Sequence, residues 1–356
     1  MSTPRTRLGL VAALLASTAL LAMPAGGNPP PAPPVTAAVA WPQAQRGTVQ
    51  AALADGAEYR PGLFLDARTS IGTAASTDDR YLRLVRVAAD GSVRRLRQLP
   101  RARHPSFQAL TVTGDVLAWV ESTDGGKLQL FTAGLSGTGA PRELTADLGR
   151  AEFYQSQYDL VIADGWVHWV AAATGDVTQV RSVALTGGPV RTRSEPGTWK
   201  LSAYPWLVNG VNDTSGSTVL RNLSTGRDSP VRGARARATT ACSPAWCRMA
   251  SLTAGGLNRI ELMRPDGSGR ERIAGDTAAT VIVDVAPLDR FEVLSRIGPN
   301  SELTGNNELI AVEIATRRTV EISPDAGSVS YRGGMLWWST GNLDAIVWHA
   351  LDLRTI

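Results

Sequence analysis

The chain has 356 residues, of which 43% are hydrophobic and 19% are charged. This length and composition are sufficient for a large buried core and exclude a disordered chain. The formal charge is +4, but Arg5 and Arg7 lie in a predicted leader, so the charge of the mature chain is close to zero. No basic stretch is interleaved with aromatic residues in the manner of a nucleic-acid reader, so we expect no nucleic-acid partner.

Residues 1–25 have the layout of a secretory signal peptide. Arg5 and Arg7 precede an apolar run over residues 8–21, and small residues follow at 22–27. The run is shorter than the roughly 20 apolar residues that a membrane-spanning helix needs. We therefore expect cleavage near Ala25, no transmembrane span afterwards, and a secreted or extracellular cell-envelope location.

Residues 26–45 form a predicted proline-rich linker. Residues 28–34 read NPPPAPP, a sequence that favours an extended polyproline conformation. It is interpreted as a spacer ahead of the folded part, and an ordinary disordered tail is the alternative. No linker-like stretch interrupts residues 46–356, so this region is predicted to be one domain.

A short alternating strand pattern recurs seven times in that domain. The copies begin at Tyr81, Leu128, Thr178, Thr218, Leu257, Leu309 and Ala345. From 81 to 345 in six steps, their mean spacing is 44 residues. Periods of this size are typical of β-propeller blades with four strands each.

Turn signals and a further strand follow most of the copies. Examples of the turns are Asp90-Gly91, Gly187-Gly188 and Asp266-Gly267, where glycine permits the positive φ of a hairpin turn. Beyond the turn lies a strand with polar alternation, such as residues 92–99, as expected for the outer edge of a blade.

An apolar segment rich in tryptophan precedes several copies. Residues 114–119, 165–169 and 334–338 are examples. Flat aromatic side chains at this position suit packing between neighbouring blades, so most of the tryptophans are interpreted as structural. His168 lies within one of these strands, and we interpret it as a structural histidine.

The predicted fold is all-β, a β-propeller of seven blades. An N-terminal strand around residues 47–53 is expected to pair with the last strand and so close the ring, because an unpaired edge would expose backbone donors and acceptors. The same segment is alternatively the inner strand of the first blade, since residues 63–67 are also strand-like. Residues 199–232 are short for a blade, which leaves a six-bladed ring with an insertion as the alternative count.

The two cysteines, Cys242 and Cys247, are separated by four residues. In an exported protein such a pair predicts a local disulfide bond. The three histidines are not at metal-ligand spacing from the pair, so no metal site is expected. No cofactor-binding motif is found either, and we expect no cofactor.

Several turns resemble those of TolB-type propellers. The matching segments are 76–82 (STDDRYL), 264–273 (RPDGSGRERI) and 323–327 (SPDAG). The resemblance extends from about residue 60 to the end, and the layout of the whole chain is similar to exported actinobacterial proteins of that class. It implies a non-catalytic binding or scaffolding module of the envelope and transfers no catalytic residue to this chain.

The first candidate ligand site is the connection over residues 152–159 (EFYQSQYD). Loops that enter the inner strands of a propeller meet at one mouth of the central channel, where their polar groups converge. A packed interblade loop is the alternative. The candidate residues are Glu152, Tyr154, Gln157, Tyr158 and Asp159.

The second candidate site is in residues 199–206, where Trp199, Tyr204 and Trp206 combine flat faces with a hydroxyl group. Such a group of side chains could stack on a sugar or a peptide, and core packing is the alternative.

The leading functional hypothesis is an exported, monomeric binding or scaffolding protein of the envelope whose ligand is a protein or a glycan. No catalytic motif is found, so no catalytic residue is assigned. The alternative is a propeller hydrolase or lyase that acts on a polysaccharide or peptide through channel-mouth acids such as Glu152, Asp159, Asp284 and Asp289. A purely structural spacer domain is the third hypothesis.

Overall fold

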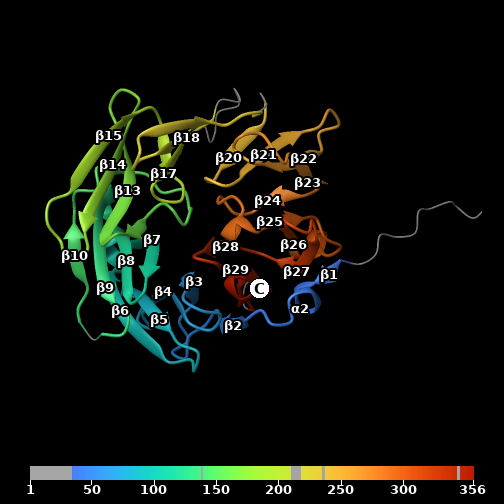
Figure 1. The fold of residues 1–356 in the computed structure, drawn as a ribbon. Helices are drawn as coiled ribbons and strands as arrows, with labels where there is room; N and C mark the ends of the chain where they lie inside the picture. The colour runs from blue at the N-terminus through green and yellow to red at the C-terminus, as the bar shows by residue number, and fades with distance from the viewer. Residues whose placement is uncertain (1–33, 138, 210–217, 235–236, 343–344) are drawn as a thin grey trace, which may run out of the picture. The chain divides into compact units, whose positions relative to one another are not determined.

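The structure is a computed structural model that describes residues 34–356 except for 138, 210–217, 235–236 and 343–344. Strands form seven sheets that follow one another around a ring (Figure 1). Five sheets contain four antiparallel strands each, and the first strand of each blade is the innermost. In blade 3 the inner strand is divided into two short strands, and blade 6 has a fifth strand added in parallel at its outer edge. The helical elements of the described residues are single turns: α2 (Ala37–Ala40), α3 (Ser301–Thr304), η1 (Arg101–Arg103), η2 (Asp124–Gly126), η3 (Pro287–Asp289) and η4 (Leu353–Thr355).

The first three blades are built from consecutive strands. Blade 1 contains β3 (Tyr59–Phe64), β4 (Ser70–Ala75), β5 (Tyr81–Val87) and β6 (Val93–Pro100). Blade 2 contains β7 (Ser106–Thr113), β8 (Val116–Thr123), β9 (Lys127–Gly134) and β10 (Arg142–Thr145). Blade 3 contains β11 (Arg150–Ala151), β12 (Val161–Ala163), β13 (Trp166–Ala173), β14 (Val177–Ala184) and β15 (Arg191–Pro196).

The other four blades complete the ring. Blade 4 contains β16 (Trp199–Leu201), β17 (Trp206–Asn209), β18 (Val219–Asn222) and β19 (Arg227–Pro230). Blade 5 contains β20 (Thr239–Cys242), β21 (Cys247–Leu252), β22 (Asn258–Met263) and β23 (Glu271–Asp276). Blade 6 contains β24 (Ala279–Thr280), β25 (Phe291–Arg296), β26 (Asn307–Glu313), β27 (Thr319–Ala326) and the added strand β1 (Val35–Thr36). Blade 7 contains β28 (Val329–Arg332), β29 (Met335–Thr340), β30 (Val347–Asp352) and β2 (Arg46–Gln50).

The seven alternating segments of the sequence are the third strands of the seven blades. They are β5, β9, β14, β18, β22, β26 and β30. The predicted seven-bladed propeller is therefore confirmed. The six-bladed alternative is wrong, because the short strands β16 to β19 still form a complete four-stranded sheet.

The ring is closed by the N-terminal strand β2, as predicted. β2 lies antiparallel to β30 in a register that runs from Arg46 opposite Leu351 to Gln50 opposite Val347. The alternative, in which this segment is the inner strand of blade 1, is wrong. That position belongs to β3.

A segment ahead of β2 also packs on the propeller. The predicted linker runs to residue 45, yet β1 pairs in parallel with β27 and the following turn α2 leads to Trp41, which is only 1% exposed. The Nε1–H group of Trp41 donates to Glu313 Oε1 at 2.6 Å. The Trp41 ring meets that of Phe291 edge-on at 5.5 Å.

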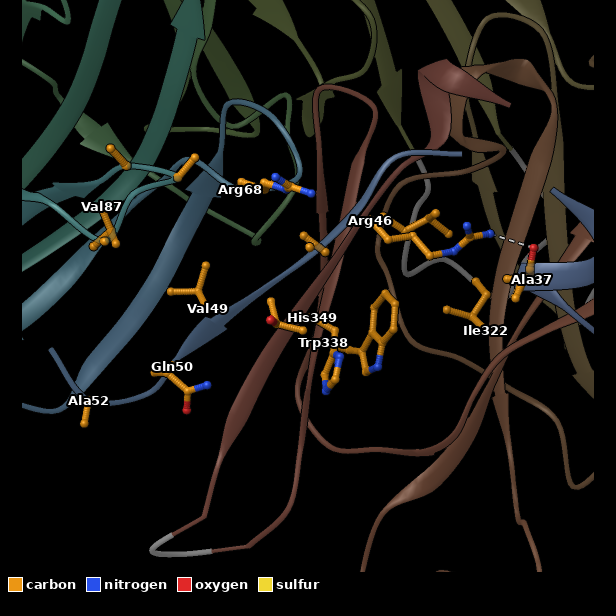
Figure 2. A pocket seen from close by; sticks show the side chains of 18 of the residues that line it. Ala37, Arg46, Val49, Gln50, Ala52, Arg68, Val87, Ile322, Trp338 and His349 are labelled. Atoms are coloured by element: carbon orange, nitrogen blue, oxygen red, sulfur yellow. Dashed lines mark hydrogen bonds between the residues drawn. The ribbon is translucent and has the colours of Figure 1, made fainter. Parts of the chain in front are cut away.

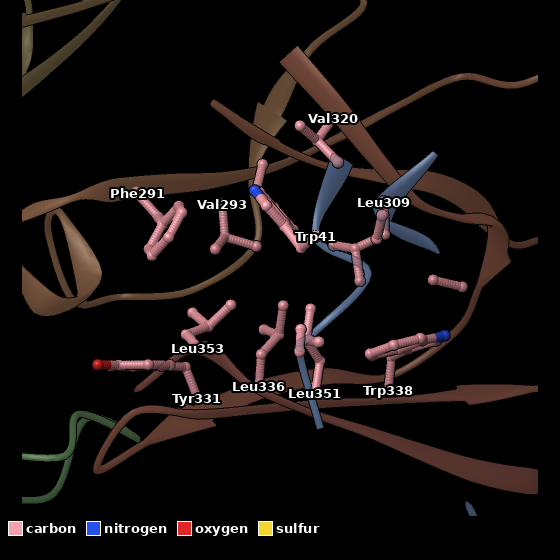
Figure 3. Close-up of a cluster of buried hydrophobic side chains, with 14 of the residues drawn as sticks. Trp41, Phe291, Val293, Leu309, Val320, Tyr331, Leu336, Trp338, Leu351 and Leu353 are labelled. Carbon is pink, nitrogen blue, oxygen red and sulfur yellow. The ribbon is translucent and has the colours of Figure 1, made fainter. Parts of the chain in front are cut away.

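Hydrophobic clusters fill the spaces between neighbouring blades. In the cluster between blades 6 and 7, Trp41 lies among side chains such as Val293, Leu336 and Leu351 (Figure 3). Trp119 and Trp169 are fully buried in two other interblade clusters. Burial of aliphatic and aromatic surface between neighbouring blades thus stabilises the ring.

The predicted disulfide bond between Cys242 and Cys247 is confirmed and joins β20 to β21 at the innermost turn of blade 5. Among the described residues, no helix has the length and apolar character needed to cross a membrane.

Trp41→Ala should lower the free energy of unfolding by roughly 3 to 5 kcal/mol, because it removes a fully buried indole and leaves a cavity between blades 6 and 7. Urea unfolding followed by tryptophan fluorescence and circular dichroism measures this loss. The matched control is Trp246→Ala, since Trp246 is half-buried and should cost less, about 1 kcal/mol. Equal losses for the two variants would show that burial of Trp41 between blades 6 and 7 makes no special contribution to stability.

Candidate functional site

The inner strand of blade 3 is interrupted. β11 pairs with residues 171–172 of β13, and β12 pairs with residues 166–168 of the same strand. Residues 152–160, between the two short strands, leave the sheet. We call this segment the plug.

The plug reaches blades on the opposite side of the ring. The Oγ–H group of Ser156 donates to Asp284 Oδ1 of blade 6 at 2.5 Å. In blade 7, the N–H group of Gly333 donates to Gln157 Oε1 at 3.1 Å. Because blades 6 and 7 stand across the ring from blade 3, the plug crosses the central channel.

Two buried carboxylates hold the plug in shape. Asp159 Oδ2 accepts the backbone N–H groups of Tyr154 at 2.7 Å and of Ser156 at 3.1 Å. Asp284 Oδ2 accepts the N–H group of Gln157 at 3.1 Å, in addition to the Ser156 hydroxyl. Both aspartates are less than 8% exposed, so each satisfies backbone donors that water does not reach.

Arg332 holds the plug from blade 7. Its guanidinium donates to the carbonyl oxygens of Ser156 at 3.0 Å and of Gln157 at 3.4 Å. Among the described residues no carboxylate lies within ion-pair distance of Arg332. The charges of Arg332, Asp159 and Asp284 act on one another across the plug without direct contact.

Burial dominates the electrostatics of this region. It raises the pKa of Asp159 to about 6, although the N–H group of Tyr154 and the charge of Arg332 lower it. Burial also raises the pKa of Asp284 and lowers that of Arg332. The pKa of Lys200 is lowered for the same reason, and its Nζ lies 3.5 Å from the centre of the Tyr154 ring.

On one side of the plug lies a small cavity of about 50 Å³, lined by Ser156, Asp159, Lys200, Cys242 and Asp284 among others. It has room for a few water molecules and not for a sugar or a peptide. Asp159 and Asp284 do lie close together, on either side of Ser156, but no substrate-sized space adjoins them. The arrangement therefore does not favour glycosidase-type use of these acids.

On the other side of the plug lies an open pocket of about 530 Å³, which we call the cup. Its floor includes Gln157 and Tyr158 of the plug, and Tyr158 also lines the small cavity and packs against the cluster between blades 3 and 4. Its wall comes from the inner turns of blades 1, 2 and 7 and from β12, including Phe64, Thr113 and Arg332. This volume is within the range of small-molecule and cofactor pockets.

The structure brings the first candidate group together, since all five residues lie on the plug. Glu152 is exposed and accepts the hydroxyl of Tyr154, while Asp159 is buried and holds the backbone. Gln157 and Tyr158 reach the cup. The five side chains thus divide between support of the plug and the lining of the cup.

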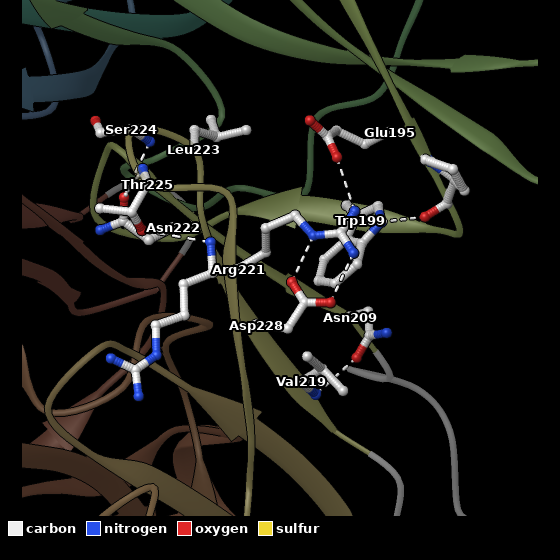
Figure 4. Close-up of polar contacts among 12 residues, drawn as sticks. Glu195, Trp199, Asn209, Val219, Arg221, Asn222, Leu223, Ser224, Thr225 and Asp228 are labelled. Carbon is white, nitrogen blue, oxygen red and sulfur yellow. Dashed lines mark hydrogen bonds and ion pairs between the residues drawn. The ribbon is translucent and has the colours of Figure 1, made fainter.

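The second candidate group does not form one surface. Trp199 packs between blades 3 and 4, whereas Trp206 packs between blades 4 and 5. The Nε1–H group of Trp199 donates to the carbonyl of Pro196, and the Arg221 guanidinium lies 4.5 Å from its ring centre (Figure 4). Tyr204 stacks on His168 with 4.1 Å between ring centres. These contacts are those of core packing, the alternative interpretation of this group.

Sequence reasoning does not single out Ser156, Lys200 or Arg332. Arg332 ends an ordinary strand and follows its plug partner Ser156 by 176 residues. No local sequence pattern predicts a contact between two residues so far apart in the chain. Asp284 is named only as one of several acids of the channel mouth, with no partner assigned.

No protein-family model matches this sequence, and no curated protein is similar to it in sequence. Solved structures are similar in fold. An uncharacterized protein of Listeria monocytogenes has a TM-score of 0.52 at 9% identity, with 79% of this chain and 88% of that one covered. TolB from Acinetobacter baumannii has a TM-score of 0.43 at 12% identity, with 74% and 65% covered.

A puromycin-hydrolyzing peptidase of Mycobacterium tuberculosis has a TM-score of 0.49 at 13% identity, with 84% of this chain but 52% of that one covered. The chain therefore spans about half of that peptidase. The predicted propeller fold is confirmed by the sheet topology, and TolB proteins are among the solved structures similar to this chain. The predicted likeness to exported actinobacterial proteins stays a prediction. At these identities the comparisons show the fold alone.

Within the part of the chain that the structure describes, no group of three or more His, Cys, Asp or Glu side chains is placed to hold a metal ion.

The raised pKa of Asp159 has a consequence for stability. Between pH 4 and 6 the folded protein binds more protons at this group than the unfolded chain does, so the free energy of unfolding should fall as the pH rises. Since the pKa is about 6 in the folded protein and 3.8 in the unfolded chain, the free energy of unfolding should fall by roughly 3 kcal/mol in total as this group loses its proton. Asp159→Asn should remove this part of the pH dependence, as measured by urea unfolding from pH 4 to pH 7.

Asp90→Asn is the matched control. Asp90 lies in an exposed turn, and its hydrogen bonds to Ser92 lower its pKa, so its contribution has the opposite sign. The free-energy curves of Asp159→Asn and the unmodified protein should diverge steadily between pH 4 and 6. Parallel curves would contradict a proton held at Asp159.

Proposed function

We propose that this protein is an exported, non-catalytic binding protein of the cell envelope, which recognises a protein or a glycan in the cup. The support comes from the side chains that line the cup.

The chemistry of the cup lining carries the proposal. Its hydrogen-bonding side chains are those of Thr111, Thr113, Gln157, Tyr158 and the two arginines Arg332 and Arg354. Among the described residues, no Asp, Glu, His, Cys or Ser side chain lines it. The carboxylate, imidazole, thiol and serine groups that most often act as general bases and nucleophiles are thus absent from the described lining. Amide, hydroxyl and guanidinium donors in this lining suit recognition of a polar ligand.

The plug makes the cup a rigid site. It closes the channel below Gln157 and Tyr158, and its backbone is fixed by Asp159, Asp284 and Arg332. A ligand would therefore meet a preorganised floor, which lowers the entropic cost of binding.

Two features support export. The first 25 residues have the layout of a secretory leader, and residues 28–34 have the composition of an extended spacer. The disulfide bond between Cys242 and Cys247 is of a kind that persists in oxidising compartments. Together they favour export of the propeller to the cell envelope.

Photo-crosslinking from the cup tests this function. A benzophenone amino acid at Thr113, an exposed residue of the cup wall, should give a discrete adduct with an envelope fraction, identified by mass spectrometry. Benzophenone inserts into C–H bonds, so it reports protein and glycan ligands alike. The same substitution at Thr77, an exposed residue that lines none of the pockets described above, should give no such adduct.

A second variant separates specific capture from chance contact. Tyr158→Ala in the Thr113 crosslinking protein shortens one of the side chains that line the cup and should weaken the adduct several-fold. Identical adducts from Thr113 and Thr77, or an adduct that Tyr158→Ala leaves unchanged, would rule out recognition in the cup.

A further inference from the structure

A groove of about 1020 Å³ crosses the outer rim of blade 7. The strand β2 runs along it (Figure 2). One side is formed by β27 and the segment around Ala37 in blade 6, and the other by the turn between β5 and β6 in blade 1. The groove is on the rim and the cup is on the channel axis, so the two sites share no lining residue.

One edge of β2 is unpaired. β2 is the last strand of its sheet, and the N–H group of Asp352 donates to the carbonyl of Gln45 at 3.0 Å. In an antiparallel pair the bonded residues alternate, so Gly47 and Val49 continue this ladder with β30. The backbone groups of Arg46, Thr48 and Gln50 therefore point away from β30. Among the described residues no other strand pairs with them.

The groove offers side-chain contacts on both faces of β2. On the face toward blade 6 lie Ile322, Trp338 and His349, and the last two rings stack with centres 5.5 Å apart. On the face toward blade 1 lie Val87 and Val93. Side chains of a strand placed beside β2 would alternate between these two apolar faces.

The charges of the groove favour an acidic occupant. Arg68 is exposed and has no ion pair among the described residues. Arg46 donates to the carbonyls of Ala37, Trp41 and Ala44 and to no carboxylate. Glu321 is the one acid among the described lining residues. The lining therefore carries two cations against one acid and complements a carboxylate.

The neighbouring blade shows that a rim strand of this fold can accept another strand. In blade 6, β1 pairs with the outer edge of β27 at Val35–Val320 and Thr36–Glu321. We propose that the free edge of β2 binds an extended, acidic peptide segment of a partner protein by β-strand addition. Backbone hydrogen bonds to Arg46, Thr48 and Gln50 supply affinity, and the two apolar faces with Arg68 supply sequence preference.

Peptide selection on the purified protein tests this proposal. The probe is a display library of random decapeptides, and enriched sequences are synthesised and measured by fluorescence anisotropy. Thr48→Pro removes the outward N–H group without removing a bond to β30, a position at which an edge strand tolerates proline. Thr48→Val keeps that N–H group and is the matched control.

The enriched peptides should alternate apolar residues and carry an acid. They should bind the unmodified protein and Thr48→Val alike, and Thr48→Pro at least about tenfold more weakly. Arg68→Glu should also weaken binding, more at low than at high salt. No enriched peptide, or peptides indifferent to both Thr48→Pro and Arg68→Glu, would overturn the proposal.

Hydrogen exchange on the unmodified protein gives a second measurement that does not depend on how well Thr48→Pro folds. Bound peptide should slow exchange of the amides of Thr48 and Gln50, which point away from β30, while the already bonded amides of Gly47 and Val49 change little. Unchanged exchange at Thr48 and Gln50 would overturn strand addition. Neither result bears on ligand binding in the cup, so the proposal for the groove and the proposed function are tested independently.

Discussion

The pairing of β2 with β30 is the constraint on which the rest of the structure depends. It joins residues about 300 positions apart and gives blade 7 its fourth strand. The entropic cost of closing so long a loop grows only slowly with its length, so a five-residue ladder can offset it when interblade clusters form at the same time. Trp41 adds such a cluster next to the closure. Once blade 7 is fixed between blades 6 and 1, the channel, the cup and the rim groove have defined walls.

The plug carries an unfavourable free energy of desolvation. It places two carboxylates and a guanidinium group out of water, where each requires compensating hydrogen bonds. The bonds it forms in return join blade 3 to Asp284 of blade 6 and to Arg332 and Gly333 of blade 7. An apolar plug could fill the same space, but only directional bonds fix which residues face the cup. The polar network thus sets the positions of Gln157 and Tyr158 in the cup floor.

The sequence predicts what is periodic and local. The third strand of each blade alternates apolar and polar residues, so the repeat, the blade count and the closing strand can be predicted, as can the Cys242–Cys247 bond. The interruption of the inner strand in blade 3 has no such signal, because its partners Asp284 and Arg332 lie 128 and 176 residues away from Ser156. Trp199 and Trp206 are neighbours in sequence, yet successive strands place them on opposite faces of blade 4. Their separation depends on strand boundaries that the sequence does not mark.

The rim strands show how the protein treats its exposed edges. β6 carries Arg94, Arg95 and Arg97, and charged side chains of this kind discourage pairing with another chain. Part of the edge of β27, at Val320 and Glu321, is covered by β1. β2 has neither protection, because the guanidinium of its one charged residue, Arg46, turns back to carbonyls of residues 37–44. The free edge of β2 has no covering strand, and no charged side chain of β2 itself extends over it. Such an edge favours association with another strand, which is harmful to a protein that must stay monomeric and useful to one that binds an extended peptide.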